Sequence, residues 1–404
     1  MLGYLFLFLL TIFIAVFVSN NKSSLKIFYI SFTVMITFNF IVHLISINNG
    51  LGGYSIFTKG ILDDEIIYRE TSLNIYSKIS EIGNLFIQDR FFVSTSEEFN
   101  LKELAKSEFY YSFLIALGYI ISGSDSIVIT RFFSAIFFSL FFVKANSFLC
   151  KALNHTKIYN EVFFLFFYPT LMIRGLQIEQ EMLVNYIMLS VIVGSIESRK
   201  INIKELVILC FIKIISAISL ASSLINQKVN KIRLLIQLII IPYILIICIR
   251  NSAPEFFNYI LAVKSYSVMD GKMDIINVDY SSIFGILETT LISSYYFIFA
   301  PLNLNIILNG SPHFRFLLLE PIFVTIIIYY LYKNFATLKK IRGLTRTIYF
   351  AFYYSLIYIF IESHITSFMR RRIIIYTLLM LLYFLVKNIK KSKKLESNPI
   401  YKSS

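Results

Sequence analysis

Long apolar blocks recur along the whole chain, separated by short polar connections. The clearest are Leu2–Ser19, Leu25–Ile47 and Ile373–Val386. A run of about 20 apolar residues matches the roughly 30 Å hydrocarbon core of a bilayer. No block alternates apolar and polar residues as a barrel strand does, whereas a helix satisfies its own backbone hydrogen bonds in lipid. The pattern therefore predicts an all-α, polytopic integral membrane protein.

The apolar blocks predict about ten to twelve transmembrane helices within one membrane domain, 1–404. The candidate segments are 2–19, 25–47, 127–150, 159–174, 181–197, 205–225, 232–250, 283–301, 314–333, 345–362 and 368–386, with a shorter apolar stretch at 109–122. The first block has no basic region before it and no small-residue cleavage site after it, so we interpret it as a membrane helix and not as a signal peptide. The orientations inferred from the two ends of the chain meet only if 205–225 or 283–301 is broken, re-entrant or a tight hairpin. Lys213 lies within 205–225, and a lone lysine in lipid is costly, which fits a broken segment there.

Composition and charge support a membrane location. Hydrophobic residues make up 57% of the chain and charged residues 15%, too little polar surface for a soluble protein of 404 residues. The formal charge of +14 is concentrated partly in Lys333–Arg346 and in a basic tail, 387–404. Basic loops of membrane proteins lie in the cytoplasm, so both stretches are predicted to be cytoplasmic. No folded basic domain is evident, which excludes nucleic acid as a partner.

The region 48–126 is predicted to form an outer, periplasmic loop. Lys22 and Lys26 favour a cytoplasmic first turn, which places the following loop outside. Within this loop, 109–122 is short for a full span. If it did span, Lys144 and Lys151 would fall on the outer side, so we interpret it as a surface or re-entrant helix. The large outer loop as a whole is predicted to carry short surface helices.

Three adjacent carboxylates, Asp63, Asp64 and Glu65, follow the second apolar block, and Tyr68 would share a helix face with Asp64. Such a group can bind a divalent cation, or it can act as general base towards a sugar hydroxyl. Asp63 and Asp64 are our candidate catalytic residues, and they are also the metal ligands if a metal is present. The alternative is an ordinary solvated turn.

A second candidate site lies at the start of the last apolar segment, where Arg370, Arg371 and Arg372 follow His364. The orientation above places these arginines outside, where the positive-inside rule disfavours them. Guanidinium groups bind phosphate bidentately, so the cluster suits a phosphate or pyrophosphate. The alternative is a local inversion of topology that makes the triplet a cytoplasmic anchor.

A third candidate pairs Arg174 with Glu181 across a turn. Charge at membrane depth suggests a functional site, although an ion pair that fastens a helical hairpin explains it equally well. The chain contains no Gly-rich nucleotide-binding motif, which argues against an ATP-driven pump.

The order of these features resembles the bacterial polyprenyl-phosphate-dependent glycosyltransferases of the GT-C fold and the O-antigen polymerases. The resemblance covers about 60–390 and is carried by several loose motifs. They are Asp63-Asp64-Glu65 with Tyr68, Phe109–Leu114, Gly123-Ser124, Thr130-Arg131-Phe132-Phe133-Ser134, Tyr168-Pro169 through Glu181, Phe297–Pro301 and Arg370–Arg372. Two points depart from the family: two helices precede the acidic loop instead of one, and no large soluble domain follows the helices.

The resemblance implies a surface-polysaccharide polymerase or glycosyltransferase in the bacterial inner membrane. Its donor would be a sugar or oligosaccharide on undecaprenyl phosphate or pyrophosphate, and its partners would include membrane lipid and other polysaccharide-assembly membrane proteins. The implied substrate-binding residues are Glu65, Tyr68, Arg131, Arg174, Glu181, His364 and Arg370–Arg372. A flippase or transporter of lipid-linked oligosaccharide is the competing function.

Overall fold

The structure is a computed structural model. It describes residues 11–12, 14–16, 22–50, 54, 64–87, 109–153, 159–177, 180–198, 203–213, 216, 251–252, 283–299, 317–338, 344–361 and 365–396. Within these ranges every regular element is a helix, which confirms the all-α prediction. The predicted segments 2–19 and 232–250 lie mostly or wholly outside the described residues.

The helices follow the apolar blocks closely. They are α2 (Lys22–Asn48), α3 (Asp64–Ile87), α5 (Phe109–Ser122), α6 (Ile127–Leu153), the 3-10 helix η1 (Asn160–Phe167), α7 (Pro169–Leu176), α8 (Glu181–Ser198), α9 (Ile203–Ile212), α13 (Ile283–Phe299), α16 (Leu319–Lys333), α17 (Phe335–Leu338), α18 (Leu344–Ile361), α19 (Ile365–Arg371) and α20 (Ile373–Glu396). Among the described residues, α2, α6 and Ile373–Lys391 of α20 are long and apolar enough to cross a membrane. These helices support a membrane protein.

Three predicted elements differ from the structure. The segment 159–174 is not one helix, because Pro169 lacks a backbone N–H and disfavours helical geometry at Tyr168, so η1 ends there and α7 begins at the proline. The outer loop holds the 24-residue helix α3, longer than the short surface helices expected. Helix α20 also continues to Glu396, through much of the predicted tail. Helix α9 ends at Ile212, immediately before Lys213, and most of the predicted segment 205–225 beyond it lies outside the described residues, so its break stays a prediction.

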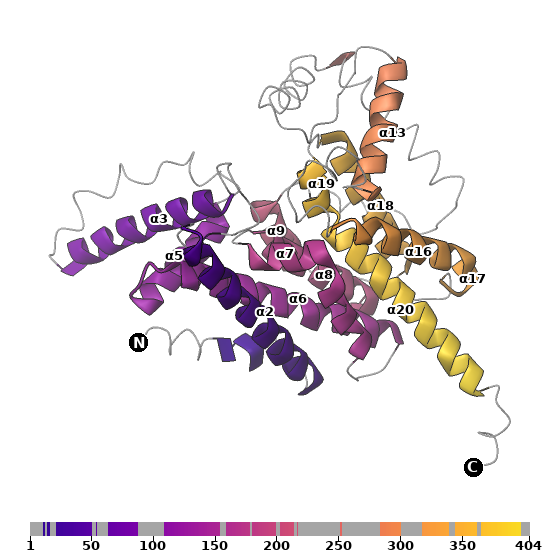
Figure 1. Ribbon diagram of the computed structural model, residues 1–404, viewed down its shortest axis with the longest axis horizontal. Helices are drawn as coiled ribbons and strands as arrows, with labels where there is room; N and C mark the ends of the chain where they lie inside the picture. The colour runs from indigo at the N-terminus through magenta and orange to yellow at the C-terminus, as the bar shows by residue number, and fades with distance from the viewer. Residues whose placement is uncertain are drawn as a thin grey trace. The chain divides into compact units, whose positions relative to one another are not determined.

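The described helices belong to two compact units. Unit 1 contains Met1–Val162, Leu171–Val193 and Ile201–Ile214. In it α2 packs along α6 (Figure 1), and α5 packs against α6 and α9. One face of α2 is buried, whereas Phe38, Phe40 and Leu44 on the other are 45%, 60% and 46% exposed. A helix that is apolar on its exposed face is suited to contact lipid.

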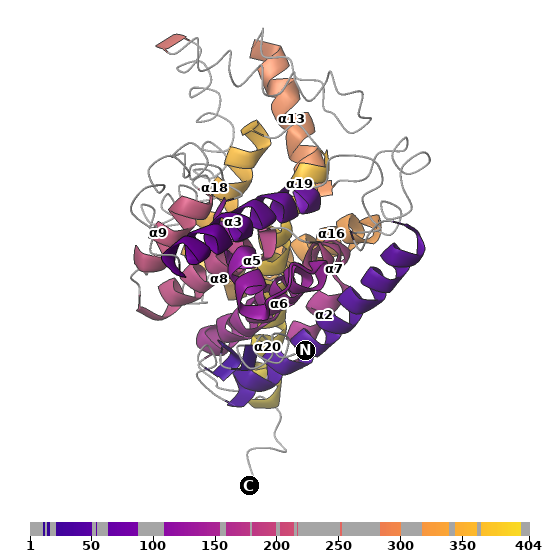
Figure 2. The ribbon, with the colours of Figure 1, turned by 90° about the vertical axis from the view of Figure 1, so that its left-hand side faces the viewer.

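Helix α3 packs along α5 (Figure 2). The buried residues of α3 recur at the spacing of one helical face: Glu65, Tyr68, Ser72 and Ile75. The Tyr68 ring meets the Tyr111 ring edge-on, with centroids 5.3 Å apart. The first acidic residue that the structure describes in full, Glu65, therefore points into the protein and not into solvent.

Gly118 on α5 allows a close approach to α6. A Cβ atom at this position would lie 2.3 Å from Cε2 of Phe133 and 3.0 Å from Cγ2 of Ile129. We expect Gly118→Ala to lower the free energy of unfolding by about 1–3 kcal/mol, the usual effect of overpacking. Thermal unfolding of the purified protein in detergent measures this. Gly194→Ala is the matched control, because a Cβ there meets no heavy atom within 4 Å; equal melting temperatures for the two variants would contradict the prediction.

Unit 2 contains Phe163–Thr170, Gly194–Lys200 and Ile215–Ser404. Helix α20 is in contact with α16, α17, α18 and α19, and α13 packs on α16, α18 and α19. The crossing of α16 over α20 is visible in Figure 1. This arrangement brings the first turn of α16 to the start of α20, where the three arginines lie.

Candidate functional site

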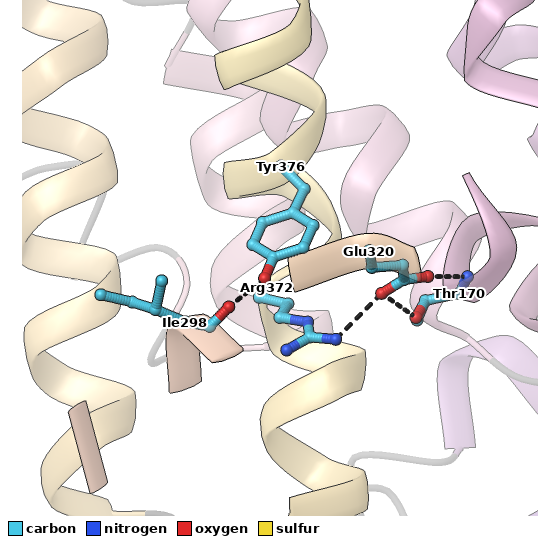
Figure 3. A network of polar contacts seen from close by, with 5 residues as sticks. All are labelled: Thr170, Ile298, Glu320, Arg372 and Tyr376. Carbon is cyan, nitrogen blue, oxygen red and sulfur yellow. Dashed lines mark hydrogen bonds and ion pairs between the residues drawn. The ribbon is translucent and has the colours of Figure 1, made fainter. Parts of the chain in front are cut away.

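The most completely described polar cluster centres on Arg372, at the turn between α19 and α20 (Figure 3). Its backbone N–H donates to the carbonyl of Phe368, and its own carbonyl accepts from the N–H of Tyr376 at 2.9 Å, so hydrogen bonding continues through the turn. The side chain is fully buried. Its Nη2 donates to Oε2 of Glu320 at 2.9 Å.

Glu320 lies in the first turn of α16 and is only 2% exposed. One oxygen, Oε1, accepts the backbone N–H of Thr170. The other, Oε2, accepts the Thr170 hydroxyl at 2.7 Å as well as Nη2 of Arg372. A buried carboxylate is tolerated only when it is paired and hydrogen-bonded, and here it receives three donors.

One tyrosine covers the guanidinium of Arg372, and a second tyrosine packs against the first. The guanidinium Cζ lies 4.7 Å from the ring centroid of Tyr376, the geometry of a cation–π contact. The Tyr376 hydroxyl donates to the carbonyl of Ile298 at the end of α13 (Figure 3). The ring of Tyr168, itself buried, lies 5.5 Å from that of Tyr376. Arg372 is thus held by one aromatic face and by one carboxylate.

The cluster has more hydrogen-bond donors than it uses. Within the described part of the chain, Nε and Nη1 of Arg372 and the hydroxyl of Tyr168 are buried without a hydrogen-bond partner. Buried polar groups of native proteins are almost always satisfied, by protein, water or ligand. These donors are therefore chemically suited to an acceptor such as a phosphate oxygen.

The other two arginines of the triplet are partly exposed. The guanidinium of Arg371 lies 5.4 Å from the ring centroid of Tyr358, and that ring lies 4.7 Å from the ring of Tyr354. His364 lies outside the described residues. The structure thus gathers Arg370, Arg371 and Arg372 at one helix start.

Unit 1 contains a separate buried polar cluster around Arg131 of α6. Arg131 is 2% exposed, and its Nη1 donates to the carbonyl of Leu176 at 2.7 Å and to Oδ1 of Asn39 at 3.4 Å. Ser134, one turn later, bonds the carbonyl of Gly175 at 2.7 Å. These α6 side chains satisfy carbonyls at the end of α7, which helix termini otherwise leave unpaired.

The remaining predicted site residues of unit 1 have local partners. Arg174 donates from Nη1 to Oε1 of Gln177 at 2.6 Å. Glu181 forms an ion pair with Lys213 at 3.4 Å, next to the end of α9. On α3, burial opposes the charge of Arg69, and it is the largest single effect on its pKa. The hydrogen bond from Nη1 to the hydroxyl of Tyr54 and the other interactions with Tyr54 and Tyr119 together outweigh burial, so the Arg69 pKa is raised above its ordinary value.

The two predicted catalytic acids are only partly covered by the structure. Asp63 lies outside the described residues, and Asp64 is the first residue of α3, with no description of its side chain. Among the described residues no group of three or more metal-ligating side chains is found. The base and metal predictions for this pair therefore stay predictions.

The sequence pattern did not predict a role for Glu320, which lies inside the predicted apolar segment 314–333. The signal was present, because an ionisable residue within an apolar segment marks a functional or paired position. Thr170 and Tyr168 belonged to a recognised motif, but their link to the last helix could not be anticipated. No protein-family model, no curated protein and no solved structure matches the chain.

Proposed function

We propose that the protein is a polytopic inner-membrane glycosyltransferase that builds a surface polysaccharide from a polyprenyl-(pyro)phosphate-linked sugar donor. It has about ten to twelve membrane helices, and its reaction takes place on the outer face of the membrane. The observation that carries the proposal is the Arg372 cluster, in which a buried guanidinium retains unpaired donors at the start of an apolar helix.

The chemistry of this cluster fits a lipid-linked phosphate. Arg372 pairs with one carboxylate, Glu320, and two further arginines, Arg370 and Arg371, directly precede it in the last turn of α19. Arg372 presents Nε and Nη1, which Glu320 does not occupy. A fixed, buried guanidinium stabilises an anion more strongly than one in water, because the surroundings do not screen it and need no reorganisation.

In the proposed reaction, a carboxylate of Asp63 or Asp64 accepts the proton of the acceptor hydroxyl. The hydroxyl oxygen forms a bond to the anomeric carbon of the donor sugar, and the bond from that carbon to the phosphate oxygen breaks. The polyprenyl phosphate or pyrophosphate leaves with the electron pair, and Arg370–Arg372 stabilise its negative charge. No nucleotide sugar is consumed at this step.

The test is to produce Asp63→Asn, Asp64→Asn and Arg371→Ala variants and to reconstitute each with a lipid-linked sugar. We expect normal amounts of protein but no long glycan, since the variants remove the base or the phosphate contact. Loss of one such group lowers kcat by about 10²–10³-fold. Long glycan from all three variants would overturn the site assignment. Movement of the donor across the bilayer without any product would instead identify a flippase.

Lys387→Gln is a matched control for the arginine variant. It removes a positive charge from the same C-terminal region, within α20 and away from the three arginines at the start of that helix. We expect this variant to make glycan of normal length. If it lost activity as Arg371→Ala does, the effect would come from charge near the membrane in general and not from the arginine cluster.

A further inference from the structure

Helices α16 and α20 run in the same general direction within unit 2. Near their starts, Oε2 of Glu320 lies 2.9 Å from Nη2 of Arg372. Ten residues after Glu320, the ring of Tyr330 lies 4.8 Å from the ring of Tyr383, which follows Arg372 by eleven residues. Helix α17, which begins directly after α16, also contacts α20. The C-terminal end of α16 therefore lies beside the C-terminal half of α20.

The exposed side chains of α16 change in character towards this end. They are apolar at Ile322, Phe323 and Ile326, which are all more than half exposed. In the last turn, Tyr329 and Tyr332 are 66% and 69% exposed. Outward-facing apolar side chains suit hydrocarbon, whereas tyrosine is enriched where the hydrocarbon meets water. The last turn of α16 therefore marks a boundary of the membrane.

Exposed lysines gather at the same boundary. Lys333 ends α16, and Lys387, Lys390 and Lys391 lie on α20; we call these four residues the lysine cluster. The Nζ of Lys390 lies 5.7 Å from the ring centroid of Tyr330, which links the lysines of α20 to the tyrosines of α16. The sequence of α20 contains a single acidic residue, at its last position. The cluster therefore has a strong excess of positive charge.

The lysine cluster and the Arg372 cluster are separated by about the thickness of a membrane. Lys390 follows Arg372 by 18 residues, which corresponds to about 27 Å along a helix. The hydrocarbon core of a bilayer is about 30 Å thick. The two clusters therefore belong to opposite boundaries of the membrane, and a ligand of the lysines is distinct from the ligand proposed for the arginines. The positive-inside rule predicts that the lysines are cytoplasmic.

We infer that the lysine cluster, with Tyr329 and Tyr330, binds the headgroup of an anionic phospholipid selectively. A lysine at a helix end extends its ammonium group towards the headgroups while its apolar stem stays along the hydrocarbon. Each lysine near an anionic membrane surface adds an attraction that a zwitterionic headgroup, with no net charge, does not provide. The lipid site uses no residue of the Arg372 cluster, and it requires no transfer of sugar.

The experiment places one fluorescent reporter at the site. The chain contains no tryptophan, so Tyr329→Trp gives the full-length protein a single tryptophan at this boundary. The protein is reconstituted in phosphatidylcholine bilayers that contain increasing fractions of phosphatidylglycerol or phosphatidylcholine with brominated acyl chains, which quench tryptophan on contact. The two quenching curves give the relative association of the lipids. We expect phosphatidylglycerol to bind about fivefold more tightly or better, as expected for at least one lysine near the headgroup.

Variants in the reporter protein connect this preference to the lysines. Lys387→Gln with Lys390→Gln should remove most of the preference, because two of the four charges are lost. Lys387→Arg with Lys390→Arg should keep it, because the charges remain. The matched control is Lys22→Gln with Lys26→Gln, which removes two exposed lysines of α2 that are also predicted to be cytoplasmic but belong to unit 1. This control should keep the preference of the reporter protein.

Two results would overturn the inference. One is equal quenching of the reporter protein by the two brominated lipids, because the site would then not distinguish headgroups by charge. The other is a loss of preference in the control as large as in the Lys387 and Lys390 glutamine variant, because the effect would then come from the overall charge of the protein. A protein that transfers no sugar would contradict the proposed function, and the quenching curves would still decide on the lipid site.

Discussion

Replacing Glu320 by glutamine is expected to destabilise the protein severely. The substitution keeps the size of the side chain but removes its charge, and Arg372 is then left as a fully buried cation without its anion. Removing one partner of a buried ion pair costs about 3–5 kcal/mol. Thermal unfolding in detergent, followed by the fraction of monodisperse protein, measures the loss.

Two further variants test whether the loss of stability comes from the broken ion pair. Glu288→Gln changes an exposed glutamate on α13, within the same unit, and we expect it to melt with the parent protein. The double variant Glu320→Gln with Arg372→Met removes both buried charges, and should regain most of the lost stability, because neutral side chains often replace a buried pair without cost. A Glu320→Gln variant as stable as the parent would show that the pair does not hold α16 to α20.

Arg372→Lys is expected to abolish most glycan transfer although it conserves the charge. Lysine can reach Glu320 with its ammonium group, but it has no second and third nitrogen to offer a phosphate. The substitution would remove the Nε and Nη1 donors of Arg372, which have no hydrogen-bond partner among the described residues. Removing donors of this kind lowers kcat by about 10²–10³-fold, which single-turnover transfer in proteoliposomes measures.

The melting temperature separates this effect from misfolding. The lysine variant keeps a cation beside Glu320, so we expect it to unfold close to the parent temperature while its activity falls. Lys390→Arg, the reverse exchange near the other end of α20, should leave both properties unchanged. An Arg372→Lys enzyme with parental kcat would mean that the unused donors of the arginine have no part in the reaction.

The local hydrophobic pattern of the sequence was sufficient to predict most helices, but it did not predict how the candidate site is assembled. The short apolar stretch 109–122 appears as α5 with the predicted bounds, and α6 begins at the predicted Ile127, because hydrophobic length and flanking polar residues are local properties. The break at Pro169 also has a local cause, because proline restricts the backbone of the residue before it and lacks an N–H. The segment was nevertheless predicted as a single helix, because the apolar residues continue across the proline.

The polar cluster could not be predicted in the same way. Arg372 meets Glu320 across 52 positions, and Glu320 meets Thr170 across 150. Such pairings depend on which helices pack against each other, and a single sequence does not reveal the packing of its helices. The sequence identified the arginines correctly as a group with unusual chemistry, but it gave no means to choose their partner from the acids of the chain.

The pairing of Glu320 with Arg372 also constrains the order in which unit 2 is completed. During synthesis α16 leaves the ribosome before α19 and α20, so Glu320 is made 52 positions before its arginine. Until Arg372 has been made, the carboxylate lacks the cation that compensates the cost of removing it from water. The first turn of α16 can therefore take its buried place only after the start of α20 has been made, and a chain truncated before Arg372 would carry an unmatched carboxylate.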